Sequence, residues 1–244
     1  MDDLKKKADQ EFESSLPMDR ESFQKLFDYL QDIKASTHFI NLSSVSVYDF
    51  EKKNLYTVKN ITEDSTTKPR DYYSKDKLET DTYIQNIKKL NNDKISYTIL
   101  RIANVFSYTK NSDAFNLIRF FLKKKIWFKC SNNTMYHFIH AKDVAFAVIL
   151  CIFNLRVSRN KIYIVSDSVN QFQLHKIYEK NCNRKLLIIT IPLRFIKFIV
   201  KYFFLPKKLL NFFLLISSEI NYDNSKVKKE LNFKLQYSLR DKII

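Results

Sequence analysis

Hydrophobic and polar positions divide the middle of the chain into short runs and longer amphipathic stretches. The runs at 37–43, 96–102 and 161–166 are rich in β-branched and aromatic residues and predict buried strands. Apolar residues at helical spacing predict helices over 72–90, 112–124, 144–153 and 173–180. The helix over 144–153 is apolar nearly all round, which favours burial. Alternating strands and helices predict an α/β fold with a parallel sheet.

The N-terminal pattern is weaker. Residues 3–14 are charged and weakly helical, and Pro17 and Asp19 then open an amphipathic helix that reaches about residue 30. The first residues lack the apolar core found in signal peptides, so we expect no signal peptide.

The segment 186–218 is the most apolar part of the chain, but Pro192, Pro206 and five basic residues interrupt it. A membrane-spanning helix needs about 20 predominantly apolar residues. The pattern therefore predicts two amphipathic helices, over 192–204 and 207–216. The basic and aromatic character of 192–216 allows contact with a membrane surface, and packing within a substrate lobe is the alternative.

Composition adds a strongly basic balance, with 42 Lys and Arg against 26 Asp and Glu and a formal net charge of +16. This charge fits either an anionic partner or a coding bias toward lysine, and we favour the bias because the lysines are scattered. No arginine-rich recognition helix, zinc module or RNP-type strand indicates a nucleic-acid partner. Three widely spaced cysteines show no metal or disulfide pattern, which suits a reducing cytoplasm.

The candidate chemistry begins at Tyr73 and Lys77, which stand four residues apart in the predicted helix and so share one face. A phenol has an ordinary pKa of about 10, and a nearby ammonium favours the phenolate. The pair is therefore a candidate acid–base device.

Four segments surround this pair in a recognisable order. The segment Phe39–Tyr48 contains a strand that ends in a pair of serines, Ser43 and Ser44. The helix with Tyr73 and Lys77 follows, and a second strand covers Tyr97–Phe106. The later segments are Phe138–Ala145 and a tail from Ser217 to Phe233. From about residue 37 to the C-terminus the chain resembles the extended short-chain dehydrogenase/reductase family, the NAD-dependent nucleotide-sugar epimerases and dehydratases. Its tail is most similar to the epimerases and 4-keto-sugar reductases of the lipopolysaccharide type.

The resemblance implies a role for each of four residues. Tyr73 would be the general base and acid, and Lys77 would lower its pKa and hold the nicotinamide ribose of NAD or NADP. Ser44 would bond the sugar hydroxyl or carbonyl, and Asn104 would contact the diphosphate of the nucleotide sugar. The resemblance also explains His140 as a structural residue before a helix near Asp143. A metal site at His137 and His140 lacks further ligands, so we expect no metal.

The resemblance also implies a fold. It is a partial Rossmann-like, doubly wound parallel sheet with a smaller, mainly helical substrate lobe. The whole chain, 1–244, would be one truncated unit. About 1–104 and 136–166 would form the sheet portion, and about 105–135 and 167–244 the substrate lobe.

Glycine is absent from the chain, although average usage of about 7% would give roughly seventeen. The resembled enzymes hold the cofactor diphosphate on a glycine-rich turn in an N-terminal half that is missing here. Asp49, Ser74 and Ser107 stand where that family has glycine. We therefore expect weak NAD(P) binding by this chain alone, and a homodimer or a missing N-terminal segment as a partner.

Three functional hypotheses follow. The first is an NAD(P)-dependent nucleotide-sugar epimerase or 4-keto-sugar reductase or dehydratase in surface-polysaccharide sugar synthesis, cytoplasmic and peripheral at the inner membrane face. The second is a degenerate, non-catalytic relative that binds a nucleotide sugar or a partner chain. The third, a basic protein of nucleic acid or membrane surfaces, has the least support.

Overall fold

A computed structural model describes residues 25, 29, 36–48, 59–69, 71–90, 94–107, 113–131, 133–183, 185–203 and 206–238. The predicted N-terminal helix lies outside these residues except for Lys25 and Tyr29, which are both helical.

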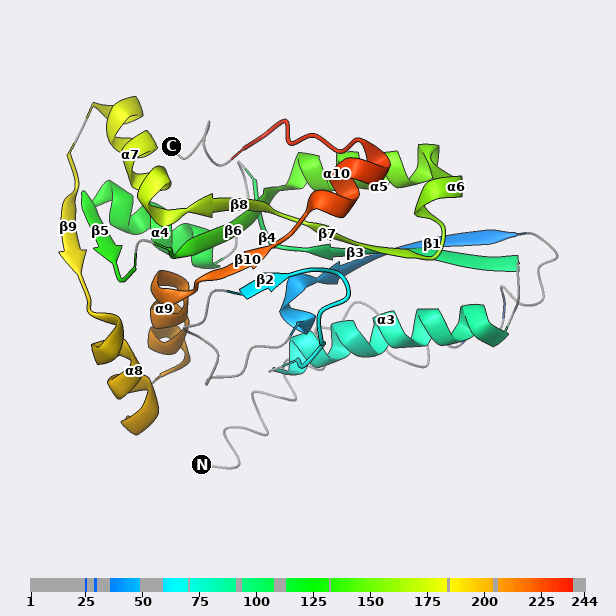
Figure 1. Cartoon of the computed structure of the whole chain (residues 1–244), viewed down its shortest axis with the longest axis horizontal. Coiled ribbons are helices and arrows are strands. Elements are labelled where there is room, and N and C mark those ends of the chain that lie inside the picture. Colours follow the sequence, from blue (N-terminus) through cyan, green and yellow to red (C-terminus); the bar gives the residue numbers. More distant parts are fainter. Residues whose placement is uncertain are drawn as a thin grey trace.

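The described chain alternates strands and helices along much of its length (Figure 1). The strands are β1 (Thr37–Ser44), β2 (Lys59–Ile61), β3 (Ile95–Ile102), β4 (Asn104–Phe106), β5 (Ile126–Lys129), β6 (Met135–His140), β7 (Lys161–Val165), β8 (Asp167–Asn170), β9 (Leu187–Thr190) and β10 (Ile220–Tyr222). The helices are the 3-10 helix η1 (Val45–Val47), α3 (Tyr72–Leu90), α4 (Asp113–Lys123), α5 (Ala141–Phe153), α6 (Leu155–Ser158), α7 (Gln171–Cys182), α8 (Leu193–Tyr202), α9 (Lys207–Ser217) and α10 (Ser225–Leu231).

The main sheet has the order β1-β3-β7 with all strands parallel, which confirms the predicted α/β class. Leu42 pairs with Leu100, and Ile99 pairs with Ile162. Figure 1 shows α3 along one side of these strands and α5, α6 and α10 along the other. The buried Ile99, Leu100 and Ile164 lie in the strands between these helices.

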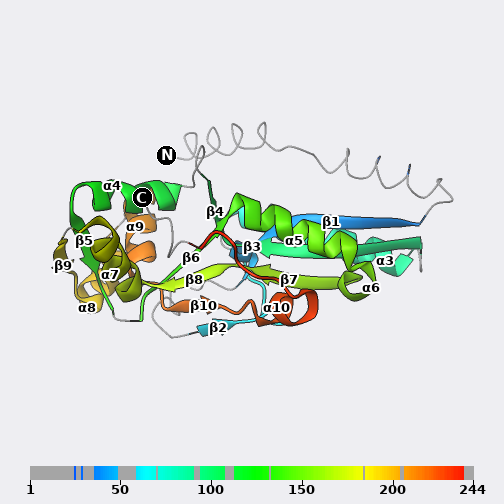
Figure 2. The ribbon, with the colours of Figure 1, turned by 90° about the horizontal axis from the view of Figure 1, so that it is seen from above.

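Shorter strands continue the fold toward the other end of the molecule (Figure 2). A second sheet has the order β4-β6-β8, in which β4 and β6 are parallel and β8 is antiparallel. Two parallel pairs, β10 with β2 and β5 with β9, complete the described strands. β2 forms in a polar part of the chain because β10 supplies its hydrogen-bonding partner. The predicted division into sheet portion and substrate lobe stays a prediction.

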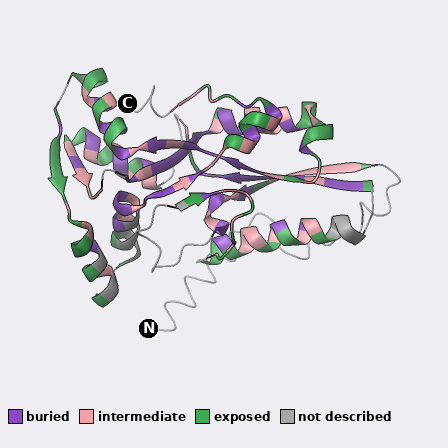
Figure 3. Cartoon of the chain, viewed as in Figure 1, coloured by how far each residue is buried: buried purple, intermediate pink, exposed green. Residues whose placement is uncertain are grey.

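Burial follows one stripe of α5 and does not cover the whole helix (Figure 3). Val144, Ala147 and Cys151 pack into the main core, whereas Ile152 and Phe153 are exposed. The predicted burial of this helix therefore holds for one stripe and not for its outer side. The sheet covers one side of α5 only, so its outer apolar residues stay in contact with solvent.

Asparagine occupies most of the positive-φ backbone positions among the described residues, where glycine is common. Among the described residues, those with positive φ are Lys125, Asn160, Asn183 and Asn232. Asn183 and Asn232 end α7 and α10 in the left-handed conformation, which asparagine tolerates better than most residues. Ser74 and Ser107 do not have positive φ, so their lack of glycine causes no backbone strain.

Candidate active site

The end of β1 forms the first part of the site. Ser44 has extended backbone angles and caps η1, where its Oγ accepts hydrogen bonds from the Ser46 N–H at 3.2 Å and the Ser46 Oγ at 2.9 Å. The chain turns sharply here because the 3-10 helix follows the strand directly. Ser44 is thereby held at the carboxyl end of a parallel strand, where α/β proteins bind ligands.

The beginning of α3 forms the second part. The Asp71 carboxylate accepts a hydrogen bond from the Ser74 N–H at 2.9 Å and another from the Ser74 hydroxyl. This is the geometry of a helix N-cap, which satisfies an otherwise unpaired backbone N–H. The cap places Tyr73 in the first turn of α3, with its side chain 42% exposed.

Ser44 and Tyr73 line the same cleft from these two elements. Burial raises the pKa of Tyr73 above its ordinary value, and the Ser44 side chain, which favours the ionised phenol, opposes this rise.

Lys77 lies on the same face of α3, with its Nζ 5.8 Å from the centroid of the Tyr73 ring. That ammonium donates a hydrogen bond of 3.4 Å to the backbone carbonyl of Leu42. The lowering of the Tyr73 pKa by Lys77, which the resemblance implies, stays a prediction. Burial is the largest influence on that pKa and raises it.

One helical turn further, Asp81 fastens α3 to the sheet. Its buried carboxylate accepts hydrogen bonds from Asn41 Nδ2 at 2.9 Å, Ser43 Oγ at 3.0 Å and Arg101 Nε at 3.2 Å. Burial raises the pKa of Asp81, and Arg101 and the two other donors oppose that rise. Because Tyr73, Lys77 and Asp81 follow at intervals of four residues, this anchor sets the rotation of the face that carries the phenol.

Asn104 enters from β4 on the second sheet. Its Nδ2 donates to the backbone carbonyl of His137 at 3.4 Å. His137 is buried, and its Nε2 donates to the Ile220 carbonyl at 2.5 Å while Ser168 donates to its Nδ1 at 2.9 Å. Burial lowers the pKa of His137 to about 4, so the ring is neutral and structural.

A cleft of about 1580 Å³ brings these parts together. Ser44, Tyr73 and Asn104 all line it, whereas Lys77 is not among its lining residues. One wall is apolar and aromatic, formed by Leu117 and Phe121 of α4, Phe128 of β5 and Leu209, Phe212 and Leu215 of α9. Motif matching missed this wall. Its sequence signals are the apolar stripes of the helices predicted over 112–124 and 207–216.

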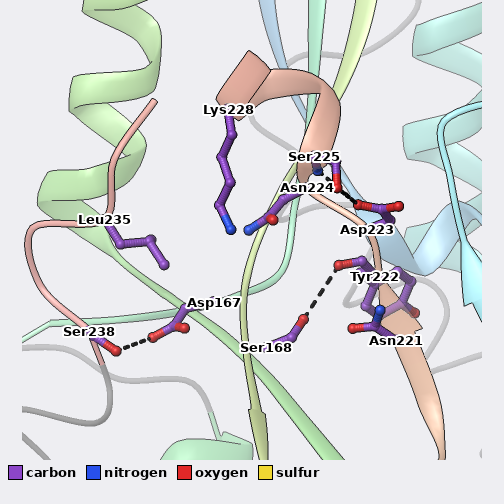
Figure 4. A pocket seen from close by; sticks show the side chains of 10 residues that line it. All are labelled: Asp167, Ser168, Asn221, Tyr222, Asp223, Asn224, Ser225, Lys228, Leu235 and Ser238. Atoms are coloured by element: carbon purple, nitrogen blue, oxygen red, sulfur yellow. Dashed lines mark hydrogen bonds between the residues drawn. The ribbon is translucent and has the colours of Figure 1, made fainter. Parts of the chain in front are cut away.

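A smaller pocket of about 590 Å³ lies beside β8, β10 and α10 (Figure 4). It is lined by Asp167, Ser168, Asn221, Tyr222, Asp223, Asn224, Ser225, Lys228, Leu235 and Ser238. Ser238 donates to Asp167 at 2.8 Å, and Ser225 hydrogen-bonds to Asp223, so its carboxylates are engaged within the fold. None of the predicted site residues lines this pocket, and the larger cleft is the candidate site.

The histidine pair of the sequence has structural roles. His140 caps α5, because its ring Nδ1 accepts the Lys142 N–H at 3.2 Å, as expected for a residue before that helix. Within the described ranges, no cluster of three or more His, Cys, Asp or Glu side chains could hold a metal ion.

The site fits one end of a nicotinamide dinucleotide. The Ser44 hydroxyl lies at the carboxyl end of β1, and the Tyr73 phenol lines the same cleft from the start of α3, which suits the nicotinamide end of such a cofactor. The diphosphate of the cofactor needs close backbone N–H groups, which glycines usually supply, and this chain has no glycine. The described residues therefore fit the nicotinamide end and not the diphosphate.

Comparison with known proteins gives a consistent result. The profile of the NAD dependent epimerase/dehydratase family matches residues 19–166, and no curated protein matches the chain.

Solved structures share the fold at low sequence identity. UDP-glucuronic acid 4-epimerase from Bacillus cereus, in complex with NAD, is 17% identical with a TM-score of 0.63, over 90% of this chain and 63% of that one. RMD from Pseudomonas aeruginosa, complexed with NADPH, is 14% identical with a TM-score of 0.59, over 89% and 68%. UDP-glucose 4-epimerase from Thermotoga maritima, with UDP-glucose, is 16% identical with a TM-score of 0.55, over 84% and 60%. The chain thus spans less than two thirds of the length of the first of these enzymes.

Proposed function

Because this chain belongs to the NAD dependent epimerase/dehydratase family, we propose that it is an NAD(P)-dependent nucleotide-sugar enzyme or the larger part of one. Its reaction class is epimerisation, or the reduction or dehydration of a 4-keto sugar. The presence of Ser44 and Tyr73 together in the lining of the large cleft carries the proposal.

The chemistry of this class requires a proton to move at a sugar oxygen whenever a hydride moves at the attached carbon. A bound nicotinamide would supply the hydride donor or acceptor. Tyr73 takes the proton from the sugar hydroxyl during oxidation and returns it to the carbonyl oxygen during reduction. Since burial raises its pKa, the phenol is protonated at neutral pH, which suits the reducing direction.

Ser44 supports this transfer from the other side of the reacting oxygen. Its Oγ accepts a hydrogen bond from the Ser46 hydroxyl, which leaves the Ser44 hydroxyl proton for a ligand in the cleft. A sugar oxygen placed between the two side chains would accept from Ser44 and exchange its proton with Tyr73. Lys77 would hold the nicotinamide ribose after leaving the Leu42 carbonyl.

The rest of the cleft suits a nucleotide sugar. Asn104 offers an amide to the diphosphate, and the aromatic wall offers an apolar surface for a base. Solved relatives hold UDP-glucose or UDP-glucuronic acid. We place the reaction in surface-polysaccharide sugar synthesis, in the cytoplasm and at the inner membrane face. We also include a second chain, a copy of this one or a separate glycine-rich half, because β1 forms an edge of the described sheet.

The test compares Tyr73→Phe with Tyr72→Phe, a neighbouring tyrosine equally exposed at 42%. The purified chain receives UDP-glucuronic acid or UDP-glucose with NAD at millimolar concentration, and products are separated by chromatography. Loss of a general acid–base group lowers the rate by about 100-fold or more, so Tyr73→Phe should show that loss and Tyr72→Phe should not. Full turnover by Tyr73→Phe would contradict the assigned role.

A second candidate is a non-catalytic relative that binds a nucleotide sugar. The raised pKa of Tyr73, the bond between Lys77 and Leu42 and the absence of glycine favour it. Amide shifts and melting temperature during titration with UDP-glucuronic acid separate the two. Binding of the sugar nucleotide without turnover supports the second candidate. If amide shifts and melting temperature do not change at millimolar sugar nucleotide, neither candidate binds a nucleotide sugar.

A further inference from the structure

One end of the molecule carries a group of exposed apolar side chains within a segment that has basic residues and no acidic one. The strand β9 pairs with β5 along one edge, and Leu187, Ile188 and Ile189 are all exposed, Leu187 to 64%. Figures 1 and 2 show β9 and α8 together at this end, away from α6 at the other. Figure 3 colours much of this end as exposed.

The helix α8 continues the same surface. Its inner residue Ile196 is completely buried and belongs to a small core with Phe213 and Ile216 of α9. Its outer side presents Phe195 and Phe198, each 53% exposed.

The outer aromatic side chains form a continuous group. Tyr202 is 63% and Phe203 58% exposed, and the rings of Phe198 and Tyr202 lie 5.0 Å apart. We call Leu187, Ile188, Ile189, Phe195, Phe198, Tyr202 and Phe203 the end face. Soluble proteins rarely leave so many large apolar side chains together in water without a binding partner.

The charge of this segment identifies the partner. Residues 186–218 include five basic residues and no acidic one. The basic residues are Arg194, Lys197, Lys201, Lys207 and Lys208. The first three follow at intervals of three and four along α8, so they occupy one stripe of the helix. Arg194 is exposed next to Phe195.

Two occupants would cover the apolar area, but only one suits the charge. A second copy of the chain would bring the same basic segment, which has no acidic residue, against this one, and like charges repel across an interface. A bilayer with anionic lipids attracts them, at about 1 kcal/mol for each basic residue near the surface. We propose that the end face binds the surface of a membrane that contains anionic lipids.

The structure also limits the mode of binding. No helix in the described parts of the chain has the length and apolar character to cross a membrane. An amphipathic helix with aromatic residues beside basic ones lies in the interface between lipid headgroups and acyl chains. In that position Phe195 and Phe198 enter the apolar layer, and Arg194 stays among the phosphates.

Binding at the end face places the candidate active site close to the lipid. The helix α9 packs on α8 through Phe213 and also lines the cleft with Leu209, Phe212 and Leu215. A nucleotide sugar in the cleft would then lie one helix away from the membrane. The inference does not depend on turnover, because vesicle binding is measured without substrate.

Sedimentation with lipid vesicles tests the proposal. The full chain is mixed with vesicles of phosphatidylcholine alone or of phosphatidylcholine and phosphatidylglycerol in equal parts. We expect binding to the anionic vesicles, weakened by high salt. The variant Phe195→Ser/Phe198→Ser should weaken binding at least about tenfold, and Arg194→Glu about five- to tenfold.

Matched controls come from the opposite end of the molecule. Phe153 is 83% exposed at the end of α5, and Arg156 is exposed on α6. Phe153→Ser and Arg156→Glu should bind anionic vesicles like the unchanged chain. Circular dichroism checks that each variant is folded.

Three outcomes would overturn the proposal. The first is that the chain does not bind anionic vesicles. The second is that the control variants weaken vesicle binding as much as the end-face variants do. The third is that the chain does not bind vesicles but forms a dimer in analytical ultracentrifugation, which Phe195→Ser/Phe198→Ser dissociates. The last outcome would assign the end face to a second copy of the chain.

Discussion

At the scale of single residues, the buried charged and polar groups decide how the site is held. Asp81 is completely buried, yet it has three hydrogen-bond donors from β1 and β3. Arg101 is its ion-pair partner and also lies over the Tyr48 ring at 4.8 Å. A buried charge is tolerated only when it is paired in this way. The position of the candidate phenol thus depends on a carboxylate two helical turns away.

Replacing Asp81 should be costly. In Asp81→Asn the Arg101 guanidinium stays buried without its counter-charge, which lowers the free energy of unfolding by about 3–5 kcal/mol. Asp76→Asn, on the same helix but without that ion pair, should change it by about 0.5 kcal/mol or less. Urea unfolding followed by circular dichroism measures both. Equal stabilities of the two variants would contradict the anchoring role.

His137 makes stability depend on pH. Its pKa is about 4 in the folded chain against 6.5 for an unperturbed histidine, so the unfolded chain takes up the proton first as the pH falls. Its contribution to stability is therefore complete above about pH 6.5 and is lost progressively toward pH 4. Between pH 7 and pH 5 this amounts to about 2 kcal/mol.

The variant His137→Gln tests that assignment, because glutamine can still donate and accept hydrogen bonds but does not titrate. Its unfolding free energy should be less steep between pH 7 and pH 5 than that of the unchanged chain. His175→Gln is the comparison: burial also lowers the pKa of His175, so this variant should reduce the slope as well, and the two reductions give the share of each histidine. If His137→Gln leaves the slope unchanged, the loss of stability comes from other groups.

At the scale of elements, α3 connects sequence pattern with candidate chemistry. The amphipathic pattern predicted a helix over 72–90, and α3 has these same bounds. Its first turn is the place where the fold brings the phenol to Ser44. The cap at Asp71 therefore acts on stability and on the geometry of the site together.

Removing this cap should loosen the start of α3. Asp71→Ala leaves the Ser74 N–H without its acceptor and should lower the free energy of unfolding by about 1 kcal/mol. Asp71→Ser keeps a capping oxygen and should remain within a few tenths of a kcal/mol of the unchanged chain. Hydrogen exchange of the first-turn amides provides the local readout. Equal exchange in both variants would exclude a capping role.

At the scale of the whole molecule, the parallel sheet is narrow. In the part of the chain that the structure describes, β1 pairs only with β3 and so forms an edge. Leu42 on this strand is 45% exposed. Exposed parallel edges favour pairing with another strand. The cleft that Ser44 and Tyr73 line is thus beside an open edge of the described sheet.

This arrangement predicts that the 244-residue chain binds NAD or NADP weakly. Losing two or three charge-assisted hydrogen bonds to the diphosphate costs about 4 kcal/mol, which turns a micromolar dissociation constant into a millimolar one. Calorimetric titration of the purified chain with NAD and with NADP measures the dissociation constant for each cofactor. A dissociation constant at or below about 10 μM would show that another segment replaces the glycine-rich turn.

Much of the architecture was predictable from local pattern. Hydrophobic periodicity located the three parallel strands and the helices, and Pro192 and Pro206 marked where α8 and α9 begin. Four-residue spacing placed Tyr73 and Lys77 on one face of a helix. These features follow from backbone geometry over a few residues, so the sequence alone determines them.

Other features depend on segments that are far apart in the chain. Packing of α4, β5 and α9 forms the apolar wall of the cleft, and β10 supplies the partner of β2. Burial raises the pKa of Tyr73 although a lysine stands one turn away, because desolvation depends on what covers the ring. The catalytic roles of Ser44, Tyr73 and Lys77 stay predictions. Periodicity is a property of neighbours in sequence, whereas solvent exclusion and long-range pairing arise only when the chain is folded.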